Sequence, residues 1–83
     1  GEGQIKKSEG DGSAYKIKSP LPGTIKKVNV SVGDTVKEGD CLMVMEAMKM
    51  DNNVMSEKGG TIKAIKVKEG DAVLQGDTLV EIA

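Results

Sequence analysis

The stretch Glu-Ala-Met-Lys-Met at residues 46–50 holds the one reactive group that the sequence singles out, the side-chain amine of Lys49. This lysine stands between Met48 and Met50, which are large apolar residues and poor turn formers. The chain has no His, and the apolar neighbours of its single cysteine, Cys41, suggest a buried residue and not a reactive thiol. No phosphate-binding glycine loop or serine nucleophile motif is present. The sequence therefore predicts a domain with no catalytic residue, in which a primary amine is available for covalent attachment.

The composition points to one small all-β domain. A chain of 83 residues buries only about 60 to 65% of its surface on folding, so its core must be compact and regular. With no Trp or Phe, that core has to come from nine Val, six Ile, four Leu and five Met, and the β-branched residues favour strands. Three of the methionines are expected in the core or on strand faces: Met43, Met45 and Met55.

Charge and hydropathy argue against two classes of partner. The net charge is −1, and the lysines are dispersed and matched by 13 Asp and Glu, so no basic stripe could follow a phosphate backbone. No apolar run approaches the roughly 20 residues of a membrane span, and no signal-peptide pattern is present. We expect no nucleic-acid partner and no direct membrane insertion. We also expect a soluble, cytoplasmic domain, a location that the single cysteine fits.

The beginning of the chain differs from the rest. Residues 1–13 are rich in Gly and Ser and contain one strongly apolar residue, Ile5, which is too little to offset the entropy cost of ordering. We expect a flexible linker or tail at residues 1–13 and a folded domain at residues 14–83.

The domain is an internal repeat. Residues 19–46 align with residues 56–83 at an offset of 37, with 12 identities in 28 positions and no gap. Such self-similarity indicates two copies of one supersecondary unit. Extended backwards, the copies span residues 14–46 and 51–83, and only residues 47–50 are left between them. Two four-strand copies predict two antiparallel sheets related by an approximate two-fold axis.

Each copy contains the pattern Gly-Asp-x-Val-x-x-Gly-Asp, at residues 33–40 and 70–77. Gly permits positive φ and Asp can bond nearby backbone, so the pattern predicts tight turns that flank a very short strand. Calcium binding is the alternative for paired Asp residues, but the spacing lacks the ligand run of a calcium loop. We expect turn chemistry and no metal site.

The segments between the turns alternate in polarity. Val28, Val30 and Val32 share one parity with polar residues between them, which is the pattern of a half-buried strand. Ile25 and its counterpart Ile62 are out of phase with this pattern. They indicate either a β-bulge or a strand that contacts two layers, and the sequence leaves both possibilities open.

Residues 47–50 connect the two copies and are predicted to form a hairpin turn, because a strand is expected on each side. The approximate two-fold places this hairpin at one end of the domain and both chain termini at the other. Lys49 would then stand at the tip, as a solvated turn residue or as a functional amine. Exposed methionines beside it have a cost unless a partner contacts them, although they could instead pack the end of the sandwich.

This motif, set between two half-repeats, resembles the biotinyl domain of biotin-dependent carboxylases, decarboxylases and transcarboxylases over about residues 15–83. The resemblance implies a flattened β-barrel, or barrel-sandwich hybrid, with biotin as the cofactor in amide linkage to Lys49. It also implies a recognition turn around the lysine, formed by Glu46, Ala47, Met48 and Met50.

The function that this resemblance implies is that of a biotin carboxyl carrier. A biotin protein ligase would attach biotin, a biotin carboxylase would load it, and a carboxyltransferase or decarboxylase would move the carboxyl group to or from an acyl-CoA or keto acid. The two halves align without a gap, so the thumb insertion of bacterial acetyl-CoA carboxylase carriers is missing. We therefore expect a parent of the propionyl- or methylmalonyl-CoA, pyruvate or oxaloacetate type, or a transcarboxylase.

The sequence leaves two alternatives open. A lipoyl carrier shares the fold, but its relatives usually have Asp before and Ala after the modified lysine. A non-covalent interaction module built on the barrel-sandwich fold would explain the repeat. It would not explain the Met-Lys-Met sequence at residues 48–50.

Overall fold

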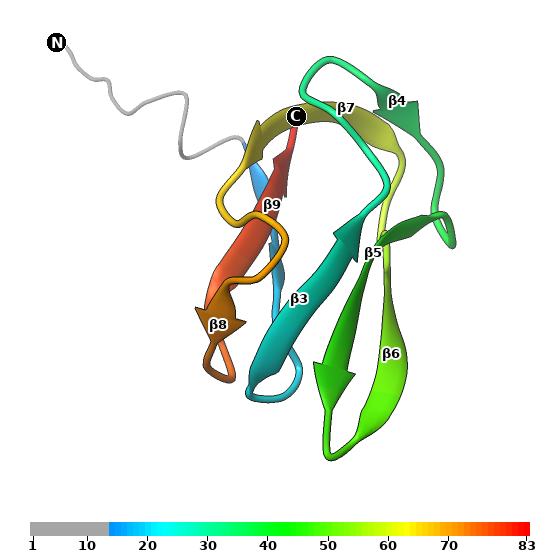
Figure 1. Cartoon of the computed structure of the whole chain (residues 1–83). Coiled ribbons are helices and arrows are strands. Elements are labelled where there is room, and N and C mark those ends of the chain that lie inside the picture. The colour runs from blue at the N-terminus through cyan, green and yellow to red at the C-terminus, as the bar shows by residue number, and fades with distance from the viewer. Residues whose placement is uncertain (1–13) are drawn as a thin grey trace, which may run out of the picture.

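Eight strands form two antiparallel four-stranded sheets in the computed structural model, which describes residues 14–83 (Figure 1). In chain order the strands are β2 (Tyr15–Lys18), β3 (Gly23–Val28), β4 (Thr35–Val36), β5 (Cys41–Ala47), β6 (Met50–Met55), β7 (Gly60–Ile65), β8 (Ala72–Val73) and β9 (Thr78–Ile82). Within the described range, no helix is long and apolar enough to cross a membrane. The linker predicted at residues 1–13 lies outside the described residues.

Each sheet combines strands from both copies of the repeat. One sheet has the order β2-β9-β7-β4 and the other the order β6-β5-β3-β8. The offset of 37 residues carries β2 onto β6, β3 onto β7, β4 onto β8 and β5 onto β9, and it thereby carries one sheet onto the other. The two copies interlock, which confirms the predicted all-β barrel-sandwich fold with two pseudo-two-fold related halves.

The core lies between the sheets and is aliphatic. Its largest fully buried side chains come from the central strands β3, β5, β7 and β9, and they are Ile25, Leu42, Met43, Met45, Ile62, Leu79, Val80 and Ile82. Met43 and Met45 are completely buried in the core, and Met55 lies on the edge strand β6, where it is 45% exposed; both placements were expected. Each Å² of apolar surface that is buried contributes about 25 cal/mol of stabilising free energy, so this aliphatic cluster is the main source of stability.

The repeated Gly-Asp pattern forms the expected turns. Gly33 and Gly70 have φ values of 96° and 94°, and nothing lies within 4 Å of where a Cβ would stand, so the requirement for Gly is conformational. The Ser31 N–H donates a hydrogen bond to Asp34 Oδ2 at 2.8 Å, and Asp71 accepts the equivalent bond in the second copy. These carboxylates are engaged by turn backbone. No cluster of acidic, His or Cys side chains within residues 14–83 could hold a metal ion.

The phase change at Ile25 is a β-bulge. The pairing of β3 with β5 shifts register between Ile25 and Lys27, and the pairing of β7 with β9 shifts between Ile62 and Ala64. A bulge inserts one unpaired residue and turns the following side chains to the opposite face. This resolves the alternative that the sequence left open, and it does so identically in both copies.

Two side chains are more exposed than the sequence predicted. Val32 is 63% exposed, because β3 ends at Val28 and the chain enters the turn in which the Asp34 N–H bonds the Ser31 carbonyl. The prediction of one half-buried strand face that includes Val32 is therefore wrong. Cys41, expected to be buried, is half-buried, because it is the first residue of β5 and borders a turn.

The two ends of the molecule differ (Figure 1). The turn between β5 and β6 lies at one end, which we call the hairpin end, while β2 begins and β9 finishes at the other, which we call the open end. At the open end Tyr15 lies opposite Ile82 in the β2–β9 pairing. The hairpin is therefore far from the point where the chain enters the domain, as the repeat predicted.

Candidate functional site

Two residues form the turn at the hairpin end. β5 and β6 remain paired up to Ala47 and Met50, so the predicted four-residue connector narrows to Met48 and Lys49. Their φ values are 56° and 64°, which suits a two-residue hairpin whose twist matches that of the strands. Left-handed backbone costs an ordinary L-residue roughly 1–2 kcal/mol relative to right-handed backbone. Residues other than Gly or Asn at both positions indicate that their side chains have a role.

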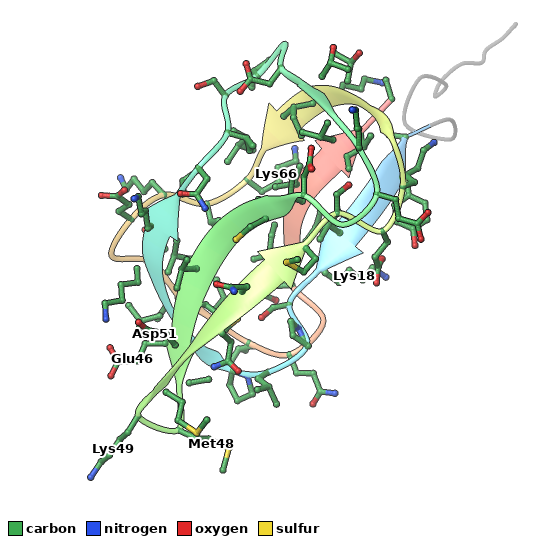
Figure 2. All side chains as sticks on the ribbon, turned by 90° about the vertical axis from the view of Figure 1, so that its right-hand side faces the viewer. Lys18, Glu46, Met48, Lys49, Asp51 and Lys66 are labelled. Atoms are coloured by element: carbon green, nitrogen blue, oxygen red, sulfur yellow. The ribbon has the colours of Figure 1, made fainter. Side chains whose placement is uncertain are left out.

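The amine of Lys49 is exposed and has no hydrogen-bond or ion-pair partner among residues 14–83. Figure 2 shows its side chain pointing away from the body of the domain, with Met48 beside it at the same tip. Met48 is 84% exposed and Met50 is 65% exposed. The structure thus brings one free amine and two solvated thioethers together at the far end of a rigid hairpin.

The other two residues of the predicted recognition turn belong to strand β5. Ala47 is buried, and its methyl group faces Gly23 on β3. A Cβ added at Gly23 would collide with the Glu46 carbonyl and crowd the Ala47 methyl group. The close approach of the two backbones explains why position 23 is Gly and position 47 is small. Of these two residues, only Glu46 has a side chain that a partner could contact.

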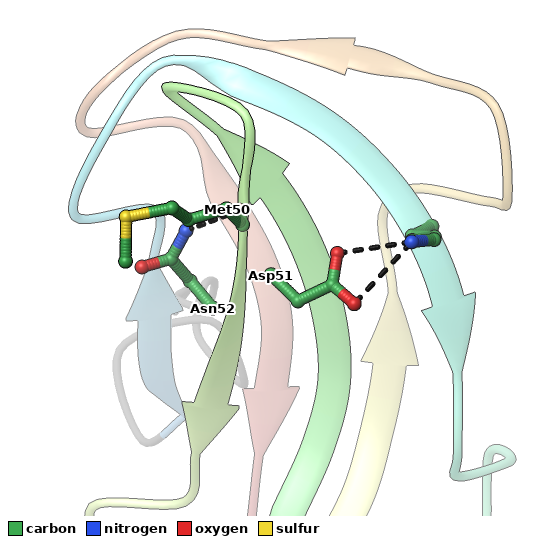
Figure 3. Close-up of polar contacts among 4 residues, drawn as sticks. Met50, Asp51 and Asn52 are labelled. Carbon is green, nitrogen blue, oxygen red and sulfur yellow. Dashed lines mark hydrogen bonds and ion pairs between the residues drawn. The ribbon is translucent and has the colours of Figure 1, made fainter.

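A charged cluster at the base of the hairpin was not predicted from the sequence. Glu46 and Asp51 lie directly opposite each other on β5 and β6, and like charges in such a pair are destabilising. Lys26 reaches across from β3, with its Nζ 3.0 Å from Asp51 Oδ1 and 3.3 Å from Oδ2 (Figure 3). The hydrogen bond to Asp51, and then the charges of Asp51 and Glu46, raise the pKa of the Lys26 amine.

The β3 bulge explains why this cluster escaped sequence analysis. Alternation along β3 does not place Lys26 beside Asp51 until the register shift between Ile25 and Lys27 is known. Asn52 adds a second local contact, because its amide Nδ2 donates to the Met50 carbonyl at 2.9 Å (Figure 3). These contacts fasten the first residues of β6 directly beneath the turn.

Comparison with known proteins identifies the family to which the chain belongs. The family model described as "Biotin-requiring enzyme" matches residues 15–82. The biotin carboxyl carrier protein of Streptococcus mutans is 52% identical over 44 residues, which is 53% of this chain and 34% of that protein. The mitochondrial propionyl-CoA carboxylase alpha chain of Caenorhabditis elegans is 57% identical over 42 residues, which is 51% of this chain and 6% of that protein. The chain thus spans about a third or less of these relatives.

Solved structures with the same fold include a carboxylase and a lipoyl domain. The urea carboxylase of Kluyveromyces lactis matches 98% of this chain and 7% of its own, with a TM-score of 0.83 and 35% identity. The lipoyl domain of the 2-oxoglutarate dehydrogenase complex of Azotobacter vinelandii matches 82% of this chain and 94% of its own, with a TM-score of 0.71 and 30% identity. The same fold is therefore found in a carboxylase and in a lipoyl domain.

The chain belongs to the biotin-requiring enzyme family, whose domains carry a covalently attached cofactor. Its cofactor is biotin, and it is a biotin carboxyl carrier domain similar to that of the Streptococcus protein. The exposed amine and its thioether flanks fit this class, because an acyl group can be attached only where an enzyme can approach the amine from solvent.

Proposed function

We propose that Lys49 is the residue to which biotin is attached in amide linkage, and that the exposed side chains around it form the surface read by a biotin protein ligase. These side chains are Glu46, Met48 and Met50, with Ala47 packed beneath them. The observation that carries the proposal is the turn itself, in which the unpartnered amine of Lys49 stands between two exposed methionines.

A ligase is needed because a lysine amine is a poor spontaneous nucleophile. An unperturbed lysine has a pKa near 10.4, so only about one amine in 2,500 is uncharged at pH 7. The chain has 12 lysines, and untargeted acylation would not select one of them. An enzyme that recognises the folded hairpin and presents an activated biotin to its tip supplies this selectivity.

The domain carries a group and does not itself catalyse a reaction. When bound, biotin supplies a ring nitrogen that accepts and releases a carboxyl group. The lysine side chain and the valeryl chain together place that nitrogen on the order of 15 Å from the backbone, given bond lengths near 1.5 Å. With residues 14–83 as the folded carrier and residues 1–13 as a tether, the hairpin end can visit a carboxylase site and a carboxyltransferase or decarboxylase site in turn.

The parent enzyme is one that acts on an acyl-CoA or a keto acid. The similarity to a propionyl-CoA carboxylase alpha chain and the uninterrupted alignment of the two repeat copies both favour the propionyl- or methylmalonyl-CoA, pyruvate or oxaloacetate type. The cytoplasmic location expected from the sequence stays a prediction.

The proposal is tested by incubating the full 83-residue chain with biotin, ATP and a biotin ligase, then measuring intact mass and mapping the modified peptide. We expect one biotinyl group, located on Lys49. Lys49→Arg should abolish the addition, because a guanidinium stays protonated at neutral pH. Lys68→Arg, which changes another exposed lysine next to a turn, is the matched control and should be labelled like the original chain.

Two other results would contradict this function. Biotin mapped to Lys58 or Lys63 in place of Lys49 would exclude the hairpin as the acceptor. Lipoylation by a lipoate ligase, with no addition by the biotin ligase, would assign the chain to the lipoyl carriers that share its fold.

A further inference from the structure

Five methionines in this small domain fall into two contrasting environments. Met43 and Met45 are completely buried on β5 between the two sheets. Met48 and Met50 are 84% and 65% exposed, and they lie on either side of Lys49. Met55 is 45% exposed, on β6 and six residues after Lys49. The most exposed thioethers are therefore those that flank the modified residue.

We propose that Met48 and Met50 are a reversible oxidation site, and that their conversion to methionine sulfoxide switches off attachment of biotin to Lys49. The proposal rests on Lys49 being the biotin acceptor. A hydroperoxide is the oxidant: one oxygen atom passes to each sulfur, the O–O bond breaks, the sulfur is oxidised by two electrons and the peroxide is reduced to water or an alcohol. A dithiol reductase reverses the step and yields water and a disulfide.

Accessibility makes the reaction selective. An oxidant must reach the sulfur atom. Met48 projects into solvent at the tip of the hairpin (Figure 2), and Met50 is 65% exposed. The sulfur of Met45 is enclosed and additionally contacts the Ser19 hydroxyl at 3.4 Å. Oxidation at the tip therefore needs no unfolding, whereas oxidation in the core needs the two sheets to separate.

Oxidation to the sulfoxide changes the polarity of a methionine side chain strongly. Methionine is flexible and apolar, and it contacts partners through a polarizable sulfur. The sulfoxide is polar and carries a strong hydrogen-bond acceptor, which must lose its water when a partner covers it. A ligase that approaches Lys49 has to cover the tip, so both altered side chains enter the contact. The fold itself is left unchanged because neither side chain packs in the core.

The test exposes the apo chain to a graded series of hydrogen peroxide and maps oxidised methionines by mass spectrometry. Oxidised and untreated samples are then compared for the initial rate of biotinylation at several chain concentrations. We expect Met48 and Met50 to be oxidised well before Met43 and Met45. We expect kcat/KM for biotinylation to fall at least tenfold, and a mixture of the two methionine sulfoxide reductases to restore it.

Two variants separate the tip from the rest of the chain. In Met48→Leu/Met50→Leu the ratio of treated to untreated rates should stay near one, because no sulfur remains at the tip. Met55→Leu should keep both the original basal rate and the full loss after peroxide. A doubly oxidised chain whose kcat/KM is within twofold of the untreated value would overturn the proposal, as would core methionines that oxidise as fast as those at the tip. Failure to label Lys49 before any peroxide is added would instead contradict the proposed function.

Discussion

The hairpin end and the open end are built from two strand pairs that the repeat relates to each other, β5–β6 at the hairpin end and β2–β9 at the open end. Met45 lies opposite Asn52 in the β5–β6 pair, and their repeat counterparts Ile82 and Tyr15 lie opposite each other in the β2–β9 pair. A register irregularity interrupts both pairs at the equivalent point. The strand pair that supports Lys49 thus has an equivalent at the other end of the molecule.

Buried polar contacts repeat in the same way. Ser19 and Ser56 are both buried, and each hydroxyl donates to the carbonyl two residues later, at 2.6 and 2.5 Å. The Ser19 N–H donates to the Asp77 carbonyl and the Ser56 N–H to the Asp40 carbonyl. No buried side-chain nitrogen or oxygen atom in the described range is left without a partner. The two ends therefore rest on equivalent, fully satisfied interiors.

The ends differ in the turn that joins the strands and in the residues next to that turn. At the hairpin end the chain continues through Met48 and Lys49, whereas at the open end Ala83 and Ala14 stand where Glu46 and Asp51 stand in the other copy. The fold therefore provides an equivalent supporting strand pair at either end. The four-residue connector at residues 47–50, found at one end alone, carries the proposed attachment site.

The largest change in stability is expected in the core. The core residues are equivalent at the two ends, whereas the tip residues exist at the hairpin end alone. Met45→Ala and Ile82→Ala each remove a completely buried side chain and should lower the free energy of unfolding by about 2–5 kcal/mol. Met48→Ala and Met50→Ala should change it by under about 1 kcal/mol while slowing biotinylation. Urea denaturation of the four variants measures this. A tip variant as unstable as a core variant would show that its methionine packs the domain.

A smaller effect is expected where backbones approach closely. An added Cβ at Gly23 would meet the Glu46 carbonyl beneath the hairpin, and one at Gly60 would meet the Ala83 carbonyl at the open end. Gly23→Ala and Gly60→Ala should each cost about 1–3 kcal/mol of stability. Only Gly23→Ala should also slow biotinylation of the folded chain, because it displaces β5 next to the turn. Equal slowing in both variants would remove the distinction between the ends.

The smallest effect concerns the charged cluster, which has no counterpart at the open end, since Ala14 replaces Asp51 there. Because the pKa of Lys26 is raised by Asp51, the contribution of this pair to stability is present below the unfolded pKa of lysine and is lost as pH rises through the folded pKa. Melting temperatures from about pH 8 to about pH 11 should thus fall slightly more for the original chain than for Lys26→Met. Lys18→Met is the control, and a difference that persists unchanged at the highest pH would contradict this account.

The sequence predicted what depends on repetition and local chemistry. The offset of 37 revealed both sheets, and the Gly-Asp pairs at Gly33 and Gly70 revealed the positive-φ turns. The sequence alone could not distinguish a β-bulge at Ile25 from a strand that contacts two layers, because both give the same phase change in the polarity pattern. The prediction for Val32 failed because its apolar alternation continues past the end of β3.

At the site, the sequence identified the exposed tip but not its support. Lys49 and the flanking methionines were evident because their residue types conflict with turn propensity. The burial of Ala47 and the Lys26–Asp51 ion pair depend on how β3 lies against β5 and on the register after the bulge. Both are set by tertiary pairing, which leaves no local signal in the sequence.

We propose that the connector at residues 47–50 determines which lysine accepts biotin, whichever of the two equivalent strand pairs carries it. A circular permutant tests it most directly: Ala83 is joined to Ala14 through Ala-Met-Lys-Met, the chain is opened between Met48 and Lys49, and Lys49→Arg is included. We predict that the folded permutant takes up one biotin on the inserted lysine at the former open end, at a rate within about tenfold of the original. A permutant with a native-like circular dichroism spectrum and melting transition that takes up no biotin would contradict the claim, and would show that side chains found only at the original hairpin end are required.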